Sequence, residues 1–249
     1  MQATRHLFRP ARARYGHRAM ARVRNATRFW KDPAAAEAAR RVIVPNEAPV
    51  FTIEPRQIFG RAAPLEVEIG AGRGDFIIGR AAANPDRNFL AVERPGTIGR
   101  LLAVRCGRAG LENLRVAAMD ARTLVSLMLP EGSVDTFHVY FPDPWPKSRQ
   151  VKHRLFAPSF VRGLMRTLKP GGLVYVATDV AQWAAEMFER LEAAGFRQTA
   201  GQAPGATLTG FARKYLAQGK SVFSGGFEPV AREVPSVLTA LRRSGILKP

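Results

Sequence analysis

The sequence predicts one doubly wound α/β domain, in which crossover helices join the strands of a parallel sheet. Short apolar runs alternate with amphipathic segments from Pro64 onward, the pattern expected of such a sheet. A glycine-rich turn follows the first apolar run, as in open sheets that bind ligands at their carboxyl edge. We find no internal repeat in the 249 residues, a length that one large domain can fill.

The apolar runs, together with the glycine and proline residues that separate them, predict the individual strands and helices. Strands are expected at Leu65–Ile69, Phe89–Glu93, Leu114–Ala118, Val134–Phe141 and Leu173–Thr178. Helical patterns lie near Asp75–Ala83, Thr97–Ala109, Arg122–Met128, Pro158–Leu168 and Ala181–Ala194. Lys169-Pro-Gly-Gly172 predicts a helix end and a turn into the next strand. Beyond Gly195 the pattern weakens, with short strands expected near Phe196–Thr199 and Ser221–Phe223.

The chain is strongly basic. It carries 38 Lys and Arg against 20 Asp and Glu, a formal charge of +18. A charge of this size favours an anionic partner, and nucleic acid is the commonest. Two alternatives are an anionic membrane surface and a generally Arg-rich proteome. Against a membrane, the chain contains no long uncharged apolar span and no lipidation motif.

The cysteine and histidine residues indicate the cellular compartment and whether a metal site is expected. Cys106 is the only cysteine, so no disulfide can form within the chain, which fits a reducing cytoplasm. The four histidines are scattered without the spacing of metal ligands. We therefore expect a cytoplasmic protein with no metal site and no membrane association.

The amino-terminal residues differ in composition from the rest. Residues 1–31 contain nine Lys and Arg and no acid. Such a block is typical of an arm that contacts nucleic acid, although a mitochondrial transit peptide has a similar composition. We favour the RNA-contacting arm. The expected organisation is a basic, flexible arm over residues 1–40 followed by a single domain over 41–249.

The segment "LEVEIGAGRGDF" predicts a nucleoside site. Glu68 lies near the end of the first strand, and Gly70, Gly72 and Gly74 allow the turn to bend sharply beside a ligand. A pyrophosphate would be repelled by Glu68, whereas a ligand bearing a cation suits it. Glu93 ends the second strand, where an acid can accept both ribose hydroxyls.

Asp120, after the third strand, is placed to reach an adenine amino group. An alternative holds for each of the three acids, which is that it caps the helix that follows. Three acids at successive strand ends beside a glycine turn favour the ligand site, because ligands of open α/β sheets bind at those ends.

These residues resemble the S-adenosylmethionine site of Rossmann-like methyltransferases. A closer resemblance rests on "FPDPWPKSRQVKHRL", on "ATD" at 177–179 and on "TGFARKYLAQG" at 209–219. These segments resemble the bacterial tRNA (guanine-N7)-methyltransferase family, from about Ile53 to Phe223, and Pro-Asp-Pro-Trp is the most specific part. The resemblance implies a seven-stranded, mostly parallel sheet with the last strand antiparallel.

The same resemblance implies a reaction and its residues. S-adenosyl-L-methionine would donate a methyl group to N7 of a guanine in the variable loop of tRNA (tRNA position 46). Asp143 would be the catalytic residue and also contact the cofactor. The residues implied to contact the tRNA are Lys147, Asp179, Thr209 and Phe211. A monomer or homodimer is expected.

The proline-rich segment after the fourth strand has its own physical interpretation. Pro142, Pro144 and Pro146 fix φ and remove amide donors, so they make a stiff lip that holds Asp143. Trp145 either stacks on a base or fills the core. The basic residues that follow, Lys147, Arg149, Lys152 and Arg154, either hold phosphates or form a solvated helix start.

The chain departs from the family at one motif. The family has Thr, a basic residue, an aromatic residue and Glu where this chain has Thr209, Gly210, Phe211 and Ala212. Arg213 or Lys214 could replace the lost contact. Two rival functions stay open from the sequence: an amino-methyltransferase acting on another nucleobase, and a non-catalytic RNA-binding protein that retains the fold.

Overall fold

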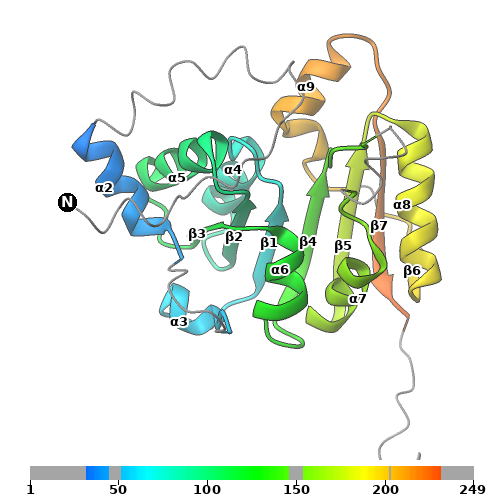
Figure 1. The fold of residues 1–249 in the computed structure, drawn as a ribbon, viewed down its shortest axis with the longest axis horizontal. Coiled ribbons are helices and arrows are strands. Elements are labelled where there is room, and N and C mark those ends of the chain that lie inside the picture. Colours follow the sequence, from blue (N-terminus) through cyan, green and yellow to red (C-terminus); the bar gives the residue numbers. More distant parts are fainter. Residues whose placement is uncertain (1–31, 45–51, 146–153, 202, 231–249) are drawn as a thin grey trace, which may run out of the picture.

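The computed structural model describes residues 32–44, 52–145, 154–201 and 203–230. A seven-stranded sheet runs through them in the order β3-β2-β1-β4-β5-β7-β6 (Figure 1). Strands β1 to β5 are parallel neighbours, and β7 is antiparallel to both β5 and β6. This is the doubly wound, mostly parallel sheet with an antiparallel last strand that the sequence predicts.

Most strands begin and end close to their predicted bounds. The observed strands are β1 Leu65–Ile69, β2 Asn88–Glu93, β3 Leu114–Ala118, β4 Val134–Tyr140, β5 Leu168–Thr178, β6 Phe196–Thr199 and β7 Phe223–Pro229. Two predictions differ from the structure. The Lys169–Gly172 turn lies within β5, where the register with β4 shifts. The last strand extends from Phe223 to Pro229 rather than ending at Phe223.

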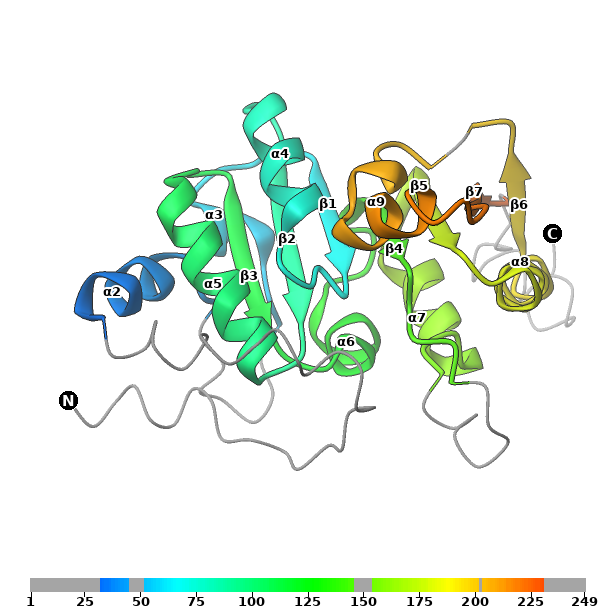
Figure 2. The ribbon, with the colours of Figure 1, turned by 90° about the horizontal axis from the view of Figure 1, so that it is seen from above.

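Helices cover both faces of this sheet. The observed helices are α2 Pro33–Val42, α3 Pro55–Phe59, α4 Asp75–Ala83, α5 Thr97–Ala109, α6 Ala121–Thr123 continued by the π-helix Leu124–Met128, α7 Pro158–Thr167, α8 Ala181–Ala193 and α9 Gly210–Leu216. One apolar cluster joins α2, α4 and α5 to one face, and a second joins α3, the π-helix, α7 and α8 to the other. Seen from above, α4 and α9 lie on the side opposite α7 and α8 (Figure 2).

Helix α2 packs closely against α5. Ala35 and Ala39 are fully buried, and a Cβ at Gly107 of α5 would lie 2.0 Å from the carbonyl oxygen of Ala38. Only glycine at position 107 permits this approach. The predicted arm, residues 1–40, therefore overlaps a packed helix over its last residues, while residues 1–31 lie outside the described part of the chain.

The alternation of β1 determines what lies beneath α4. Leu65, Val67 and Ile69 join the core on the α7 side. Glu66 and Glu68 are on the opposite face and are 1% and 4% exposed. Successive side chains of a strand point to opposite faces, so the pattern L-E-V-E-I buries two acids under one helix. Each acid needs a compensating partner, because a buried unpaired charge is costly.

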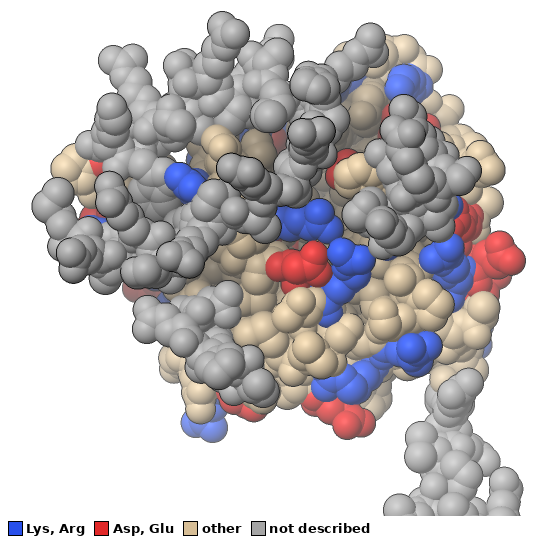
Figure 3. Space-filling model, in the orientation of Figure 1, with Lys and Arg blue, Asp and Glu red and all other residues tan. Residues whose placement is uncertain are grey.

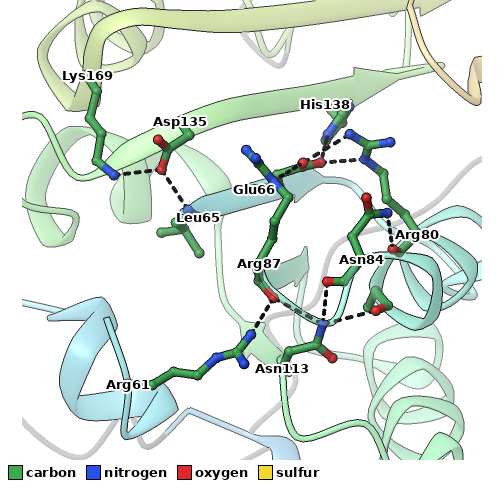
Figure 4. A network of polar contacts seen from close by, with 11 residues as sticks. Arg61, Leu65, Glu66, Arg80, Asn84, Arg87, Asn113, Asp135, His138 and Lys169 are labelled. Atoms are coloured by element: carbon green, nitrogen blue, oxygen red, sulfur yellow. Dashed lines mark hydrogen bonds and ion pairs between the residues drawn. The ribbon is translucent and has the colours of Figure 1, made fainter. Parts of the chain in front are cut away.

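Glu66 has several such partners (Figure 4). Arg80 of α4 and Arg87 pair with its carboxylate at 2.5 and 2.7 Å, and His138 Nε2 lies 2.8 Å from Oε2. Burial alone would raise the pKa of Glu66, but hydrogen bonds from His138 and Arg80 outweigh it and lower the pKa to about 2. The Tyr140 hydroxyl lies 2.9 Å from His138 Nδ1 and donates to the Pro204 carbonyl oxygen at 2.9 Å. The network thus links β1 and β4 to the segment before α9.

Glu66→Gln should lower the free energy of unfolding by about 3 kcal/mol, because it leaves two partly buried arginines without their charge partner. Urea denaturation at pH 7 measures this loss. Because the folded pKa of Glu66 is below its ordinary 4.5, the wild-type contribution is complete above pH 4.5 and disappears as the pH falls toward 2. Glu37→Gln, which breaks an exposed pair on α2, should change stability little. Equal effects of the two variants would contradict this account.

Candidate functional site

Four predicted features follow four neighbouring strands and meet at one edge of the sheet. In the strand order β3-β2-β1-β4 they are Asp120, Glu93, the Gly70–Gly74 turn and Asp143. Glu68 lies beside them in β1, on the face that α4 covers. Parallel strands that end together bring the residues after them into one site, which is where open α/β sheets bind ligands.

The glycine turn is fixed to the end of β2. The amides of Gly70 and Ala71 both donate to the carbonyl oxygen of Val92, at 2.8 and 3.0 Å. Gly70, Gly72 and Gly74 have φ values of 76°, 57° and 78°, in the left-handed region that favours glycine. Apart from its chain neighbours, no atom of the described residues lies within 4 Å of a Cβ built at Gly70, so the backbone there is open on this side.

Glu68 is the least compensated acid of the site. Its Oε2 is buried and has no hydrogen-bond partner among the described residues. Burial is the main cause that raises the pKa of Glu68 well above its ordinary value, and the nearby Glu93 raises it further. A hydrogen bond from the Ile77 amide, in the first turn of α4, acts in the opposite direction. The structure thus gives Glu68 a contact with the start of α4 and gives its Oε2 no partner among the described residues.

Glu93 connects the turn to the edge of the sheet. Its carboxylate accepts hydrogen bonds from the amides of Gly72 at 2.9 Å and Arg94 at 3.0 Å. Burial raises the pKa of Glu93, these two amides lower it, and the charge of Asp143 raises it. Glu93 therefore holds the glycine turn and lies within electrostatic reach of Asp143.

Asp120 is already engaged by protein groups. Its Oδ1 accepts from the Arg122 amide at 2.9 Å and so caps α6, and Oδ2 lies 3.4 Å from Arg94 Nη2. Burial would raise the pKa of Asp120, but the hydrogen bonds and charge of Arg122 outweigh it, and the pKa is lowered. The helix-capping interpretation thus holds for Asp120, and a ligand contact would be additional.

Sequence reasoning missed Arg94. Its guanidinium is near Asp120, and its positive charge also lowers the pKa of Asp143. Arg94 directly follows Glu93, so its position after β2 was the signal that could have identified it. It is a cation at the centre of an otherwise acidic edge.

The proline lip leaves β4 in a strained conformation. Phe141 and Trp145 have φ values of 52° and 43°, which are unusual for non-glycine residues. The Phe141 amide donates to the Ala177 carbonyl oxygen at 2.7 Å, so the start of the lip is tied to β5. Asp143 is exposed, and its pKa is raised by partial desolvation, which the charge of Arg94 opposes.

The predicted substrate residues of the carboxyl-terminal half gather around α9. Asp179 pairs with Lys220 at 3.3 Å, and the Lys220 ammonium lies 4.5 Å from the centre of the Tyr215 ring. Phe211 is 54% exposed, and its ring stacks with those of Phe141 and Tyr215 at 6.5 and 6.3 Å between centroids. The aromatic rings of α9 thus extend from the residue that starts the lip.

Thr209 was predicted to contact the tRNA, but its side chain is buried in the structure. It is 7% exposed and is the N-cap of α9. Its hydroxyl accepts from the Ala212 amide at 3.0 Å and donates to the Ala206 carbonyl oxygen at 3.2 Å. Gly210 packs against Asp75, whose Oδ2 would lie 2.7 Å from a Cβ at position 210. Within the structure Thr209 caps a helix, and a substrate contact by its side chain stays a prediction.

The basic residues after the lip divide into two groups. Lys147, Arg149 and Lys152 lie outside the described residues, as does Pro146. Arg154 is described and is only 19% exposed, with its guanidinium bound to protein groups. The structure therefore gives Arg154 internal partners where the sequence predicted a phosphate contact or a helix start.

Charge is distributed unevenly along the chain. Residues 1–31, 146–153 and 231–249 supply +9, +3 and +3, and Glu47 supplies one negative charge, so the described residues carry only +4 of the +18. On the face in Figure 3 basic and acidic side chains are intermixed. No helix among the described residues is long and apolar enough to span a membrane, and no group of acids, histidines or cysteines within those residues is arranged to hold a metal ion.

Comparisons with known proteins show which proteins this chain resembles. Residues 62–224 match the protein family described as "Putative methyltransferase". A tRNA (guanine-N(7)-)-methyltransferase of Halorhodospira halophila is 44% identical over 174 residues, which cover 66% of this chain and 74% of that protein. A protein of the same name from Paenarthrobacter aurescens is 39% identical and covers 71% of this chain, although only 62% of that relative is matched.

Solved structures show the fold. The 16S rRNA methyltransferase KamB superimposes with a TM-score of 0.54 at 20% identity, covering 74% of this chain and 97% of that one. A 16S rRNA (adenine(1408)-N(1))-methyltransferase variant with its cosubstrate SAM, from Catenulisporales acidiphilia, gives 0.54 at 21% identity, covering 73% and 92%. The doubly wound methyltransferase fold predicted from the sequence is confirmed.

Glu68→Gln should stabilise the protein at pH 7, because the wild-type carboxylate is buried without a full set of partners. A glutamate with a raised folded pKa binds its proton more tightly in the folded state, so wild-type stability falls as pH rises above 4.5. The gain in unfolding free energy should be on the order of 1 kcal/mol or more at pH 7 and should shrink toward pH 4.5. Urea denaturation across this range measures it. A loss of stability at pH 7 comparable to that of Glu66→Gln would refute it.

Proposed function

Because this chain belongs to the tRNA (guanine-N7)-methyltransferase family, we propose that its sheet edge binds S-adenosylmethionine and that Asp143 faces the guanine. The family resemblance predicted from the sequence is confirmed. The activity is S-adenosylmethionine-dependent transfer of a methyl group to N7 of a guanine in tRNA.

The residues of the edge fit S-adenosylmethionine. The free Oε2 of Glu68 suits a cationic group of this ligand, which carries an ammonium and a sulfonium. The open backbone at Gly70 permits close approach, and the Glu93 carboxylate can also accept hydrogen bonds from ribose hydroxyls. Asp120 would contact the adenine in addition to capping α6. When bound, the cofactor supplies an activated methyl group.

Asp143 would act on the guanine without removing a proton. Guanine N7 carries a free lone pair, so its methylation requires no general base. The transfer makes the purine cationic, and a carboxylate at the lip stabilises this positive charge while it accepts hydrogen bonds from the base. The hydrogen bond from the Phe141 amide to β5 fixes the start of the lip that carries Asp143. The observation that supports this role most is that Asp143 follows β4 at the same edge of the sheet as Glu93 and Arg94, within electrostatic reach of both.

The α9 aromatic residues would contact the RNA beside the target base. Phe211 exposes a ring that Phe141 and Tyr215 support from behind, and an exposed aromatic ring is a stacking surface for an unpaired base. Lys220 and Asp179 add charged groups next to Tyr215. The tRNA-binding surface would therefore start at the lip and continue along α9.

The departure from the family motif has a structural meaning in this chain. Thr209 and a residue three positions later form the pattern of a capping box, in which a Glu at the later position would bind back to the cap. Ala212 stands at that position and is fully buried. The Thr209 side chain still caps α9. Without a Glu at position 212, the start of the helix lacks the second hydrogen bond of the capping box. We infer that α9 keeps its position through the Thr209 cap.

Most of the electrostatic attraction to RNA would come from segments outside the described residues, because those segments hold most of the excess positive charge. Lys147 belongs to one of them. The solved structures are about 20% identical and show the fold alone, so they do not support the amino-methyltransferase alternative. A cytoplasmic location and a monomer or homodimer are part of the proposal.

Asp143→Asn keeps the size of the side chain and removes its charge. We expect the rate of methyl transfer to fall by roughly 10²-fold, as when a preorganised electrostatic group is lost, with cofactor affinity nearly unchanged. Single-turnover measurements at saturating tRNA and S-adenosylmethionine isolate the chemical step. Asp86→Asn, on an exposed loop away from the edge, is the matched control. A normal rate for Asp143→Asn would remove Asp143 from the mechanism.

Deletion of residues 1–31 tests the role of the arm. Since these residues carry nine positive charges, we expect weaker tRNA binding and a flatter dependence of log Kd on log salt, because fewer counterions are released. Binding titrations from low to moderate salt measure the slope, and calorimetry should show unchanged cofactor affinity. An unchanged slope would mean that the arm does not contact the RNA.

A further inference from the structure

Arg154 holds the lip from behind. Its Nε donates to the Pro144 carbonyl oxygen at 3.0 Å, and Nη2 donates to the Trp145 carbonyl oxygen at 3.4 Å. These are the first two carbonyls after Asp143 in the chain. A guanidinium presents several donors in a rigid plane, so one side chain can bind adjacent carbonyls together. Arg154 therefore restrains the backbone that carries Asp143.

Arg154 is in turn held by α8. Its Nη1 donates to Glu186 Oε2, and its guanidinium carbon lies 5.2 Å from the centre of the Trp183 ring. Trp183 is 2% exposed and belongs to the buried face of α8, together with Met187 and Leu191. The helix is thus a firmly packed base, and Arg154 is fixed between it and the lip.

Glu186 has a second partner that makes the arrangement more rigid. Its Oε1 lies 2.6 Å from Arg190 Nη2, and Arg190 Nη1 donates to the Phe156 carbonyl oxygen at 2.6 Å. One carboxylate therefore connects, through two arginines, to the chain before and after residues 146–153. Phe156 is fully buried and packs against Trp183, so this second connection ends in the core.

We propose that Glu186, acting through Arg154, is a positioning residue for Asp143 in methyl transfer. The inference rests on the proposed role of Asp143. The lip bears non-glycine residues with φ of 52° and 43° at its two ends, and such conformations persist only where surrounding contacts enforce them. The Arg154 bonds to Pro144 and Trp145 are contacts of this kind. Without the charge of Glu186, the Arg154 guanidinium loses the partner that orients it, and Asp143 loses its fixed place.

Glu186→Gln tests this directly. We expect the single-turnover rate at saturating tRNA and S-adenosylmethionine to fall by roughly 10- to 100-fold, the effect of misplacing a reacting group by about 1 Å. Cofactor affinity should stay unchanged, because Glu186 is not part of the sheet edge. Glu189→Gln is the matched control: it removes the same charge from an exposed position of the same helix and should react at the wild-type rate. Arg154→Lys cannot bind both carbonyls and Glu186 together, so it should reproduce the slow rate. This variant replaces Glu186→Gln in the test if Glu186→Gln folds poorly.

A double variant separates positioning from general loss of structure. If Glu186 acts through Asp143, then Asp143→Asn combined with Glu186→Gln should be no slower than Asp143→Asn alone. Independent, multiplied effects would overturn the proposal, as would a wild-type rate for Glu186→Gln together with Arg154→Lys. If Asp143→Asn itself reacts normally, the proposed role of Asp143 fails and this inference fails with it. A slow Asp143→Asn beside a normal Glu186→Gln rejects the positioning role alone.

Discussion

The structure depends on how β1 buries two acids under α4. Glu66 and Glu68 are two residues apart on the same face, yet they have opposite environments. Glu66 is paired with two arginines and hydrogen-bonded to His138, and it joins β1 and β4 to the segment before α9. Glu68 keeps a buried oxygen without a hydrogen-bond partner among the described residues, at the edge where the ligand is expected. One acid supports the fold, and we propose that the other meets a cationic group of the cofactor, at a cost in stability.

The rest of the site is arranged around that edge by contacts from distant parts of the chain. The glycine turn is fastened to β2, and Glu93 is fastened to the turn. The lip is restrained on one side by β5 and on the other by Arg154, which Glu186 of α8 holds in place. Rigid strands and helices thus fix the position of each functional group, so these groups need to move little when substrates bind. Preorganised sites lower the barrier to reaction in this way.

Sequence patterns predicted this edge well because strand ends, glycines and acids have strong local signals. They identified Glu68 from its place before the glycine turn but gave no role to Glu66, because the contacts of Glu66 with Arg80 and Arg87 are not visible in the sequence. Helix α2 was missed because its burial depends on contact with Gly107, far along the chain. Arg154 was assigned to phosphates because its positive charge, and not its buried partners, is visible in the sequence.

The central claim is that the buried Glu68 becomes ionised when it meets the positive charge of the cofactor. Calorimetry of S-adenosylmethionine binding at pH 6, in buffers with different ionisation enthalpies, measures the protons released on binding. Because burial raises the pKa of Glu68 in the free protein, binding should lower that pKa and release a proton. We predict that proton release is clear in the wild type and strongly reduced in Glu68→Gln. Equal proton release in the two proteins would show that Glu68 does not meet the charge of the ligand.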